Sequence, residues 1–382
     1  MQQIATMKEL TAINELILKM NNLNRWSDFR QFDVYNELNK QAFNCIIAFE
    51  LASFVEKKGR RVEWICFPRI AINRAFAKAY VYYDTPEHKI SFSAKIGNIE
   101  KDKFDDVTRE YITVKTSKKF ASFLCDNNSK YEEAIYKASS KIATYIELLE
   151  YEKLVLNQNL VFQKKDEIMK EINEYMYIPG VKEFINPDSQ IFKLFQFVSS
   201  LRNKLRWATC DKSVKCSVLG HLFDTAIWSY FIGLEQSSFD EHLATKFFFM
   251  GIFHDIAETW THDVPSPIKD KIEGYRAATE EHESQMLEEQ MYPKLASLGL
   301  DEATRNIMFE DKSNIKYRKF IKSADYLSAD SECWRNLIAG SRYYYYWDAI
   351  IKRKIDKSSK INTMMHKYLK KYARKVRRRW KQ

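Results

Sequence analysis

The chain has 382 residues and a formal net charge of +10, and 45% of its residues are hydrophobic. This length is ample for two or three domains with large cores, and the low numbers of glycine (9) and proline (7) favour a helical globular protein. No apolar run approaches the length needed to span a bilayer, and the first residues lack the apolar core of a signal peptide, so we expect no membrane partner. The six cysteines show no C-x-x-C spacing, which fits reduced thiols in a cytoplasmic protein.

Residues 1–178 are expected to form a first domain. Up to residue 165 its sequence has the pattern of amphipathic helices rich in Lys and Glu, without a His-Asp pair. A break at Tyr177-Ile-Pro179-Gly180 separates it from a second domain, residues 179–347, in which residues 186–188 mark a helix start. Residues 348–382 follow as a basic C-terminal tail.

The most informative stretch lies in the second domain, where an apolar run is followed directly by His254, Asp255 and Glu258. If the helix continues through these residues, His254 and Glu258 lie one turn apart on the same face. A metal ion at this edge could bind His254 and Asp255, and Glu258 could reach the water or substrate above it. Asp263 follows in a turn that two nearby prolines stiffen.

Two further candidate ligands lie at workable positions. His221 opens an apolar helix upstream, and Asp325 lies near the start of a helical pattern downstream. Taken singly, each residue is more simply a buried, hydrogen-bonded polar group. The four together form a nitrogen and oxygen set that suits a borderline divalent cation. Four protein ligands leave room for a substrate only around a five- or six-coordinate ion, which favours Mn, Co or Fe over Zn, with Mg and Ni as alternatives.

The order of these four ligands resembles the H…HD…D pattern of the HD-domain metal phosphohydrolases. The likeness is greater to their bacterial 5′-deoxynucleotidase branch, which has an Arg-Trp pair before the first His, here Arg206-Trp207. In that branch a His-Asp-x-x-Glu segment leads into a Thr-x-Asp-x-Pro-x-Pro-x-Lys turn, here residues 261–269. The resemblance spans about residues 188–345.

This resemblance implies an all-α HD helical bundle that removes the 5′-phosphate from deoxynucleoside monophosphates. It implies that Glu258 acts on the attacking water and Asp263 on the leaving 5′-oxygen, an assignment that the residues alone leave open. Arg206, with its planar fork of donors, suits a phosphate group, and Lys269 is a second candidate. By the same resemblance, Trp207 would press against the sugar and disfavour a 2′-hydroxyl.

Two other functions stay open at this level. The same type of metal site could hydrolyse deoxynucleoside triphosphates, with release of triphosphate or pyrophosphate. Alternatively, the HD fold could bind nucleotides or nucleic acid without catalysis. The presence of Glu258 and Asp263 beside a complete ligand set argues against this last function, because a binding protein has no need of them.

The two halves of the chain share an order of features that predicts an internal duplication. Each half has an Arg-Trp pair, an apolar helix, and later a helix with a similar small-residue segment. We therefore expect tandem HD bundles, of which residues 1–165 form a degenerate copy without metal ligands, in a monomeric pseudo-dimer or a homodimer. The alternative is two unrelated helical domains. In this alignment Arg25-Trp26 corresponds to Arg206-Trp207, Gln41 to His221, Asn73-Arg74-Ala75 to His254-Asp255, and Ser140 to Asp325.

Residues 361–382 hold nine Lys or Arg and no acidic residue, which accounts for nine of the ten net positive charges. This segment could form a basic helix that contacts nucleic acid or an acidic partner. Equally, it could be a solvated helix that closes over the body of the protein with Met364, Met365 and Tyr368 turned inward.

Overall fold

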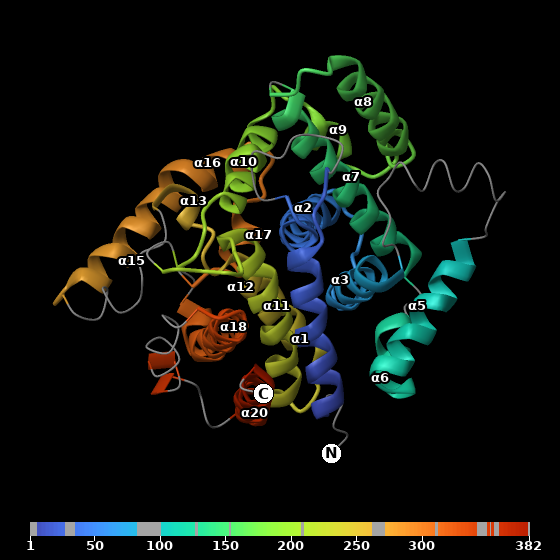
Figure 1. Ribbon diagram of the computed structural model, residues 1–382. Coiled ribbons are helices and arrows are strands. Elements are labelled where there is room, and N and C mark those ends of the chain that lie inside the picture. The colour runs from blue at the N-terminus through green and yellow to red at the C-terminus, as the bar shows by residue number, and fades with distance from the viewer. Residues whose placement is uncertain are drawn as a thin grey trace.

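The computed structural model describes residues 6–26, 35–81, 101–126, 129–152, 154–207, 210–261, 272–309, 312–341, 350–351, 353–354 and 359–380. Within these ranges the chain forms helices and no strand, which confirms the all-α fold class. The helices, labelled in Figure 1, are α1 (Met7–Asn22), α2 (Glu37–Lys57), α3 (Cys66–Phe76), η1 (Ala77–Val81), α5 (Lys101–Lys115), α6 (Lys118–Cys125), α7 (Lys130–Glu152), α8 (Gln158–Asn173), α9 (Val181–Ile185), α10 (Gln190–Ser199), η2 (Ser200–Arg202), α11 (Val218–Gln236), α12 (Glu241–Phe253), α13 (Glu258–Thr261), α15 (Tyr275–Met286), η3 (Leu287–Met291), α16 (Tyr292–Ala296), α17 (Asp301–Arg305), η4 (Lys312–Tyr317), α18 (Arg318–Ile338) and α20 (Lys360–Trp380).

Two almost wholly buried helices, α2 and α11, lie at the centre of the fold (Figure 1). Both bury side chains around their whole circumference, which is the pattern of helices enclosed by others. Each begins at a side-chain cap, because Asn36 accepts a hydrogen bond from the Asn39 amide and Ser217 accepts one from the Gly220 amide. The two helices meet at these ends, where the Ser217 hydroxyl donates to the Asn39 side chain.

Helix α12 packs closely against α11 because two glycines leave room at the contact. A Cβ atom on Gly251 would lie 2.7 Å from the Cα of Ala226, and one on Gly233 would lie 2.8 Å from the Cα of Ala244. The apolar run over 247–253 is buried, as the sequence predicts for this helix. This packing holds the C-terminal end of α12 beside the first turns of α11.

Helix α18 packs against α11, and α20 packs against α18, α11 and α1. Ile361, Met365 and Leu369 of α20 are buried, and His366 Nδ1 lies 2.8 Å from Asp330 Oδ2. The first half of the basic segment is therefore a packed helix, as one of the two interpretations of the sequence expected.

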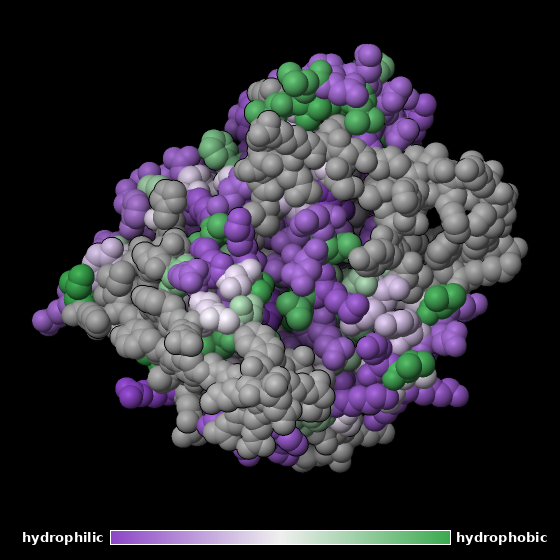
Figure 2. Space-filling view, in the orientation of Figure 1, coloured by the Kyte–Doolittle hydropathy of each residue, from purple (hydrophilic) through white to green (hydrophobic). Residues whose placement is uncertain are grey.

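Among the residues that Figure 2 colours by hydropathy, hydrophilic ones predominate on the face shown. Apolar side chains gather over α8 on this face, and the exposed apolar residues in and just before this helix include Leu156 and Phe162. Of the helices described, none is both long enough and apolar enough to cross a bilayer.

Glu50 is a buried carboxyl group between α2 and α17. Its side chain accepts a hydrogen bond from the Thr304 hydroxyl at 2.8 Å, and its second oxygen has no partner in the part of the chain that is described. Burial raises the pKa of Glu50 to about 8, and the Thr304 hydrogen bond offsets only part of this rise. The folded protein therefore retains a proton here at neutral pH.

Glu50→Gln is expected to flatten the dependence of stability on pH. Between the ordinary pKa of 4.5 and the folded pKa of about 8, the folded state keeps a proton that the unfolded state releases, so stability falls as pH rises. The free energy of unfolding falls between about pH 5 and about pH 8, and this fall should be roughly 2–4 kcal/mol smaller in Glu50→Gln than in the unmodified protein. Urea unfolding at both pH values measures this difference. Glu281→Gln, at an exposed position on α15, should keep the full pH dependence, and equal slopes in the two variants would contradict the assignment.

Candidate metal centre

Four side chains from three helical segments converge beside α11. His221 comes from the first turns of α11, and His254 and Asp255 follow the end of α12. Their potential ligand atoms all lie within 4.8 Å of one another. Asp325, from α18, places a carboxylate oxygen 3.1 Å from Nε2 of His221. The structure thus brings together all four residues that the sequence predicts as metal ligands.

The backbone around His254 differs from the helix expected there. Helix α12 ends at Phe253, and the next residues form tight turns in which Ile256 N donates to Phe253 O and Glu258 N to Asp255 O, both at 3.1 Å. The prediction that His254 and Glu258 share one face of a continuous helix is therefore wrong. The i→i+3 bonds wind the chain more tightly than an α-helix, and they let two consecutive side chains both reach His221.

Each imidazole is held through Nδ1, which directs Nε2 toward the centre of the site. His254 Nδ1 donates to the carbonyl of Gly251 at 2.8 Å, so in the neutral imidazole the lone pair is on Nε2. This Nε2 is buried and has no hydrogen-bond partner among the groups described, although it lies 3.1 Å from Asp255 Oδ2. His221 Nδ1 lies 3.0 Å from the Ser328 hydroxyl. A buried nitrogen lone pair beside two carboxylates fits a divalent cation, and the Nδ1 contacts are of the kind that orient metal-binding histidines.

The charges of the site favour ionised carboxylates. Burial raises the pKa of Asp325, but the Lys322 charge and the hydrogen bond from His221 hold it well below its ordinary value. Burial also opposes ionisation of Asp255, but its His254 neighbour lowers its pKa. For His221, burial and the charge of Arg206 lower the pKa, but hydrogen bonds to carboxylates outweigh them and raise it to about 9. A metal ion would therefore displace a proton from this site.

Lys322 is a cation of the site that the sequence analysis had not proposed for any role. Its ammonium group donates to Asp325 Oδ2 at 2.5 Å, and its charge also acts on Asp255. The side chain is 39% exposed, so it borders the site from the solvent side.

A buried carboxylate, Glu332, joins the Arg-Trp pair to the ligand His221. One of its oxygens accepts from Arg206 Nε at 3.2 Å and from Trp207 Nε1 at 2.7 Å, and the other lies 3.5 Å from His221 Nδ1. Burial raises the pKa of Glu332, but the Arg206 charge and these hydrogen bonds lower it to about 2. Trp207 has a φ of 57°, which is unusual for a large side chain and needs such contacts to hold it.

Sequence reasoning missed Glu332, although a signal was present. Glu332 follows Asp325 by two helical turns on α18, and Ser328 lies one turn after Asp325. These three polar residues share one face of the helix, and His221 meets that face.

The remaining predicted residues are placed only in part. Glu258 begins α13 and is 5% exposed, and its backbone carbonyl accepts from the Lys204 ammonium at 2.5 Å. Asp263 and Lys269 lie outside the described residues.

Two imidazoles and two carboxylates set between packed helices define a helical domain of the HD type. Residues 193–376 match the family model described as 5'-deoxynucleotidase YfbR-like. This part of the chain is a YfbR-like domain of the HD superfamily, whose members use a divalent metal. The match extends from α10 into α20 and so continues beyond the resemblance expected over 188–345. No curated protein and no solved structure matches the chain.

Glu332→Gln is expected to weaken metal binding by roughly tenfold or more, because residues that orient metal ligands contribute 10- to 100-fold to affinity. The amide keeps the shape of the side chain but loses the charge that faces His221 and Arg206. Competition with a chelator measures the affinity. The matched control is Glu147→Gln, since Glu147 accepts the same bonds from Arg25 and Trp26 in the N-terminal half. Equal metal affinities in the two variants would show that Glu332 is only a packing residue.

Proposed function

We propose that the C-terminal domain is a metal-dependent phosphohydrolase that removes the 5′-phosphate from deoxynucleoside monophosphates. The observation that carries this proposal is the convergence of His221, His254, Asp255 and Asp325 within a YfbR-like domain. These four residues would hold the ion, and the open positions needed for substrate favour Mn, Co or Fe over Zn. When bound, the ion supplies Lewis acidity that offsets charge on phosphoryl oxygens and acidifies water.

The side chains around the ligands have complementary roles in this proposal. Arg206 and Lys322 bring positive charge to the phosphate, and Arg206 is held beside His221 by its bond to Glu332. Trp207, fixed by the same carboxylate, would lie against the sugar. Lys269 is a further candidate for the phosphate.

Hydrolysis of the phosphate ester requires two proton transfers, one from the attacking water and one to the leaving oxygen. Water attacks phosphorus while the bond to the 5′-oxygen breaks. The attacking water loses a proton to Glu258, and the leaving oxygen gains one from Asp263, which yields a deoxynucleoside and inorganic phosphate. The position of Glu258, three residues after Asp255 and only 5% exposed, supports this role.

We also propose that the N-terminal half is a second HD-type copy without a metal site. Two matching turns support this. Asn24 and Asn36 form an isolated bridge as Leu205 and Ser217 do, with the same spacing. Trp26, with a φ of 58°, occupies the same unusual backbone conformation as Trp207, at 57°.

The contacts of the Arg-Trp pair are repeated as well. Glu147 of α7 accepts bonds from Arg25 at 3.0 Å and from Trp26 at 3.0 Å, as Glu332 of α18 does from its own pair. Helices of each half also contact the other half. Asn14 of α1 accepts from Ser331 of α18, whereas α10 packs against α7. This arrangement supports a pseudo-dimer within one chain.

The structural register replaces one detail of the sequence alignment. Lys40 follows the bridge residue Asn36 by the same four positions that separate His221 from Ser217, so Lys40 rather than Gln41 stands at the His221 position. Lys40 is 2% exposed, and its amino group donates to the Ser140 carbonyl and to the Thr144 hydroxyl. A buried amine whose hydrogen bonds go to Ser140 and Thr144 thus takes the place of a ligand, which supports a copy that binds no metal.

The activity is tested with purified protein supplied with Mn or Co and a panel of deoxy- and ribonucleoside mono- and triphosphates. Inorganic phosphate is expected from the deoxynucleoside monophosphates alone. His254→Ala/Asp255→Ala should lower the rate by at least about a hundredfold, because it removes two ligands of the ion that stabilises the transition state. His282→Ala, at an exposed position on α15, should retain full activity. Triphosphate or pyrophosphate release would replace the proposal with a triphosphate hydrolase, and metal binding without any turnover would refute enzymatic function.

The metal content of the chain tests the proposed degenerate copy. After dialysis against Mn or Co, elemental analysis should find one ion per chain in the unmodified protein and in Lys40→Met, and none in His254→Ala/Asp255→Ala. Lys40→Met keeps the length of the side chain while it removes the amino group. Two ions per chain, or loss of the ion in Lys40→Met, would contradict a metal-free N-terminal half.

A further inference from the structure

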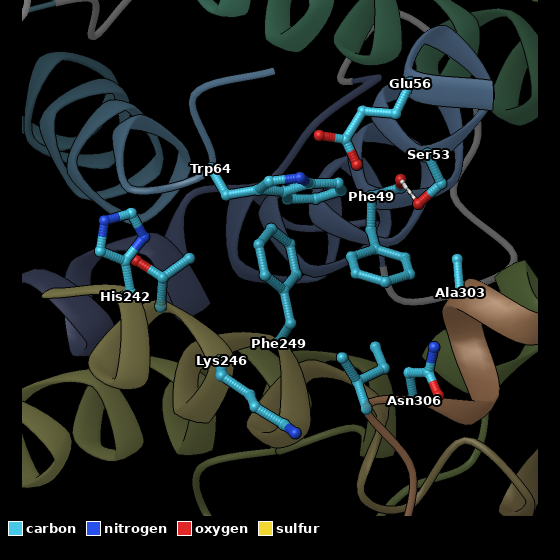
Figure 3. A pocket seen from close by; sticks show the side chains of 11 residues that line it. Phe49, Ser53, Glu56, Trp64, His242, Lys246, Phe249, Ala303 and Asn306 are labelled. Carbon is cyan, nitrogen blue, oxygen red and sulfur yellow. Dashed lines mark hydrogen bonds between the residues drawn. The ribbon is translucent and has the colours of Figure 1, made fainter. Parts of the chain in front are cut away.

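A cavity of about 340 Å³ lies between α2, α12, α17 and the segment that holds Trp64 (Figure 3). None of the candidate metal ligands lines it, and neither does the Arg206-Trp207 pair. Its size falls within the range of small-molecule sites, which often form between packed domains and have mainly apolar walls with a few polar groups. The cavity is therefore a candidate binding site separate from the metal centre.

Three aromatic rings form the apolar wall. The centroid of the Phe49 ring lies 5.2 Å from that of Trp64 and 4.9 Å from that of Phe249, and the centroids of Trp64 and Phe249 are 5.6 Å apart. Figure 3 shows these rings grouped together. Phe49 and Phe249 are buried, whereas Trp64 is only half-buried. The indole therefore offers an aromatic surface on which a planar ligand can stack.

The polar groups of the cavity are arranged around these rings. His242 and Lys246 lie one turn apart on α12, and Glu56 lies on α2. The Thr245 side chain is 3% exposed, and its hydroxyl has no hydrogen-bond partner among the groups described. A buried hydroxyl without a partner is costly, and a ligand in the cavity can supply the missing bond.

The cavity is not a general consequence of helix packing in this fold. Where α6 meets α11, aromatic rings fill the contact. Phe120 stacks on Phe231 with ring centroids 5.9 Å apart, and Phe123 stacks on Tyr230 with ring centroids 6.4 Å apart. Where α17 meets α2, the lining residues from α17 and the turn after it are smaller, and Ala303 is one of them. The space beside Phe49 and Trp64 therefore depends on these particular side chains.

We propose that this cavity binds a nucleotide as an effector, with the base against Trp64 and the phosphate at Lys246 and His242. The aromatic wall suits a base, and the Lys246 ammonium group and the His242 imidazole, one turn apart, suit its phosphate. Glu56 and the Thr245 hydroxyl can bond to the edge of the base. The choice of a nucleotide over other aromatic anions rests on the proposed function. The site shares α12 with the metal centre, and Phe49 also contacts Phe253, the residue before His254, at 5.3 Å.

The test measures binding to the full-length His254→Ala/Asp255→Ala protein without added metal, so that turnover does not interfere. The probes are 2′-deoxyadenosine 5′-monophosphate, 2′-deoxyadenosine and inorganic phosphate, titrated calorimetrically. The monophosphate should bind more tightly than either of its parts. In the same background, Trp64→Ala should weaken its binding by roughly tenfold or more, the size expected for loss of base stacking. Ala303→Trp fills the space without removing a wall, and it should abolish the part of the isotherm that depends on Trp64, whereas Arg206→Ala, in the proposed substrate site, should leave that part unchanged.

Lys246→Ala should weaken binding of the monophosphate but not that of the nucleoside. The matched control is Lys319→Ala. The Lys246 ammonium lies 5.8 Å from the centroid of the Tyr317 ring and that of Lys319 lies 4.7 Å from the centroid of the Phe320 ring, but Lys319 does not line the cavity. Thermal unfolding confirms that each variant is folded. If neither Ala303→Trp nor Trp64→Ala changes the binding isotherm, the nucleotide binds elsewhere and the proposal is overturned. Equal affinities for the nucleoside and the monophosphate would also overturn it. Because the background protein is catalytically disabled, these results are independent of whether the unmodified enzyme hydrolyses deoxynucleotides.

Discussion

The contact between the His221 imidazole and the polar face of α18 is the interaction on which the rest of the site depends. Nε2 of His221 lies against the Asp325 carboxylate, and Nδ1 lies against the Glu332 carboxylate and the Ser328 hydroxyl. In a buried setting these interactions are strong, and an isolated charge would be costly. The imidazole, the carboxylates and the Arg206-Trp207 turn therefore hold one another in place.

The Arg25-Trp26 turn has the same contacts, although no described residue of the N-terminal half belongs to a candidate metal cluster, and this separates the structural role of these contacts from a chemical one. Glu147 orders the turn of Arg25 and Trp26 there, beside the buried amine of Lys40. Arg-Trp-Glu contacts thus stabilise a turn before a central helix whether or not a metal site is present. We interpret the difference between the halves as one of side-chain chemistry: imidazoles and carboxylates suit a cation, whereas the buried amine of Lys40, whose pKa burial lowers well below its ordinary value, offers no such set.

How far the site could be predicted depended on the kind of signal. The ligands at 254 and 255 were evident because they are adjacent and follow an apolar run, and the spacing of motifs was specific enough to indicate the family. The end of α12 at Phe253 was not evident, because no proline or glycine marks it and the turn is held by backbone bonds. Glu332 was missed because its role requires Arg206 and Trp207, which are more than a hundred residues away in sequence.

The sequence by itself determined the helical class, the YfbR-like motifs and the identity of the metal-ligand candidates, since these depend on local composition and on residue order. Tertiary structure alone decided which distant groups meet. It brought Glu332 to His221 and left a cavity beside Trp64. These outcomes depend on how helices far apart in the chain pack together, and the distances between their side chains are set by that packing rather than by any local pattern.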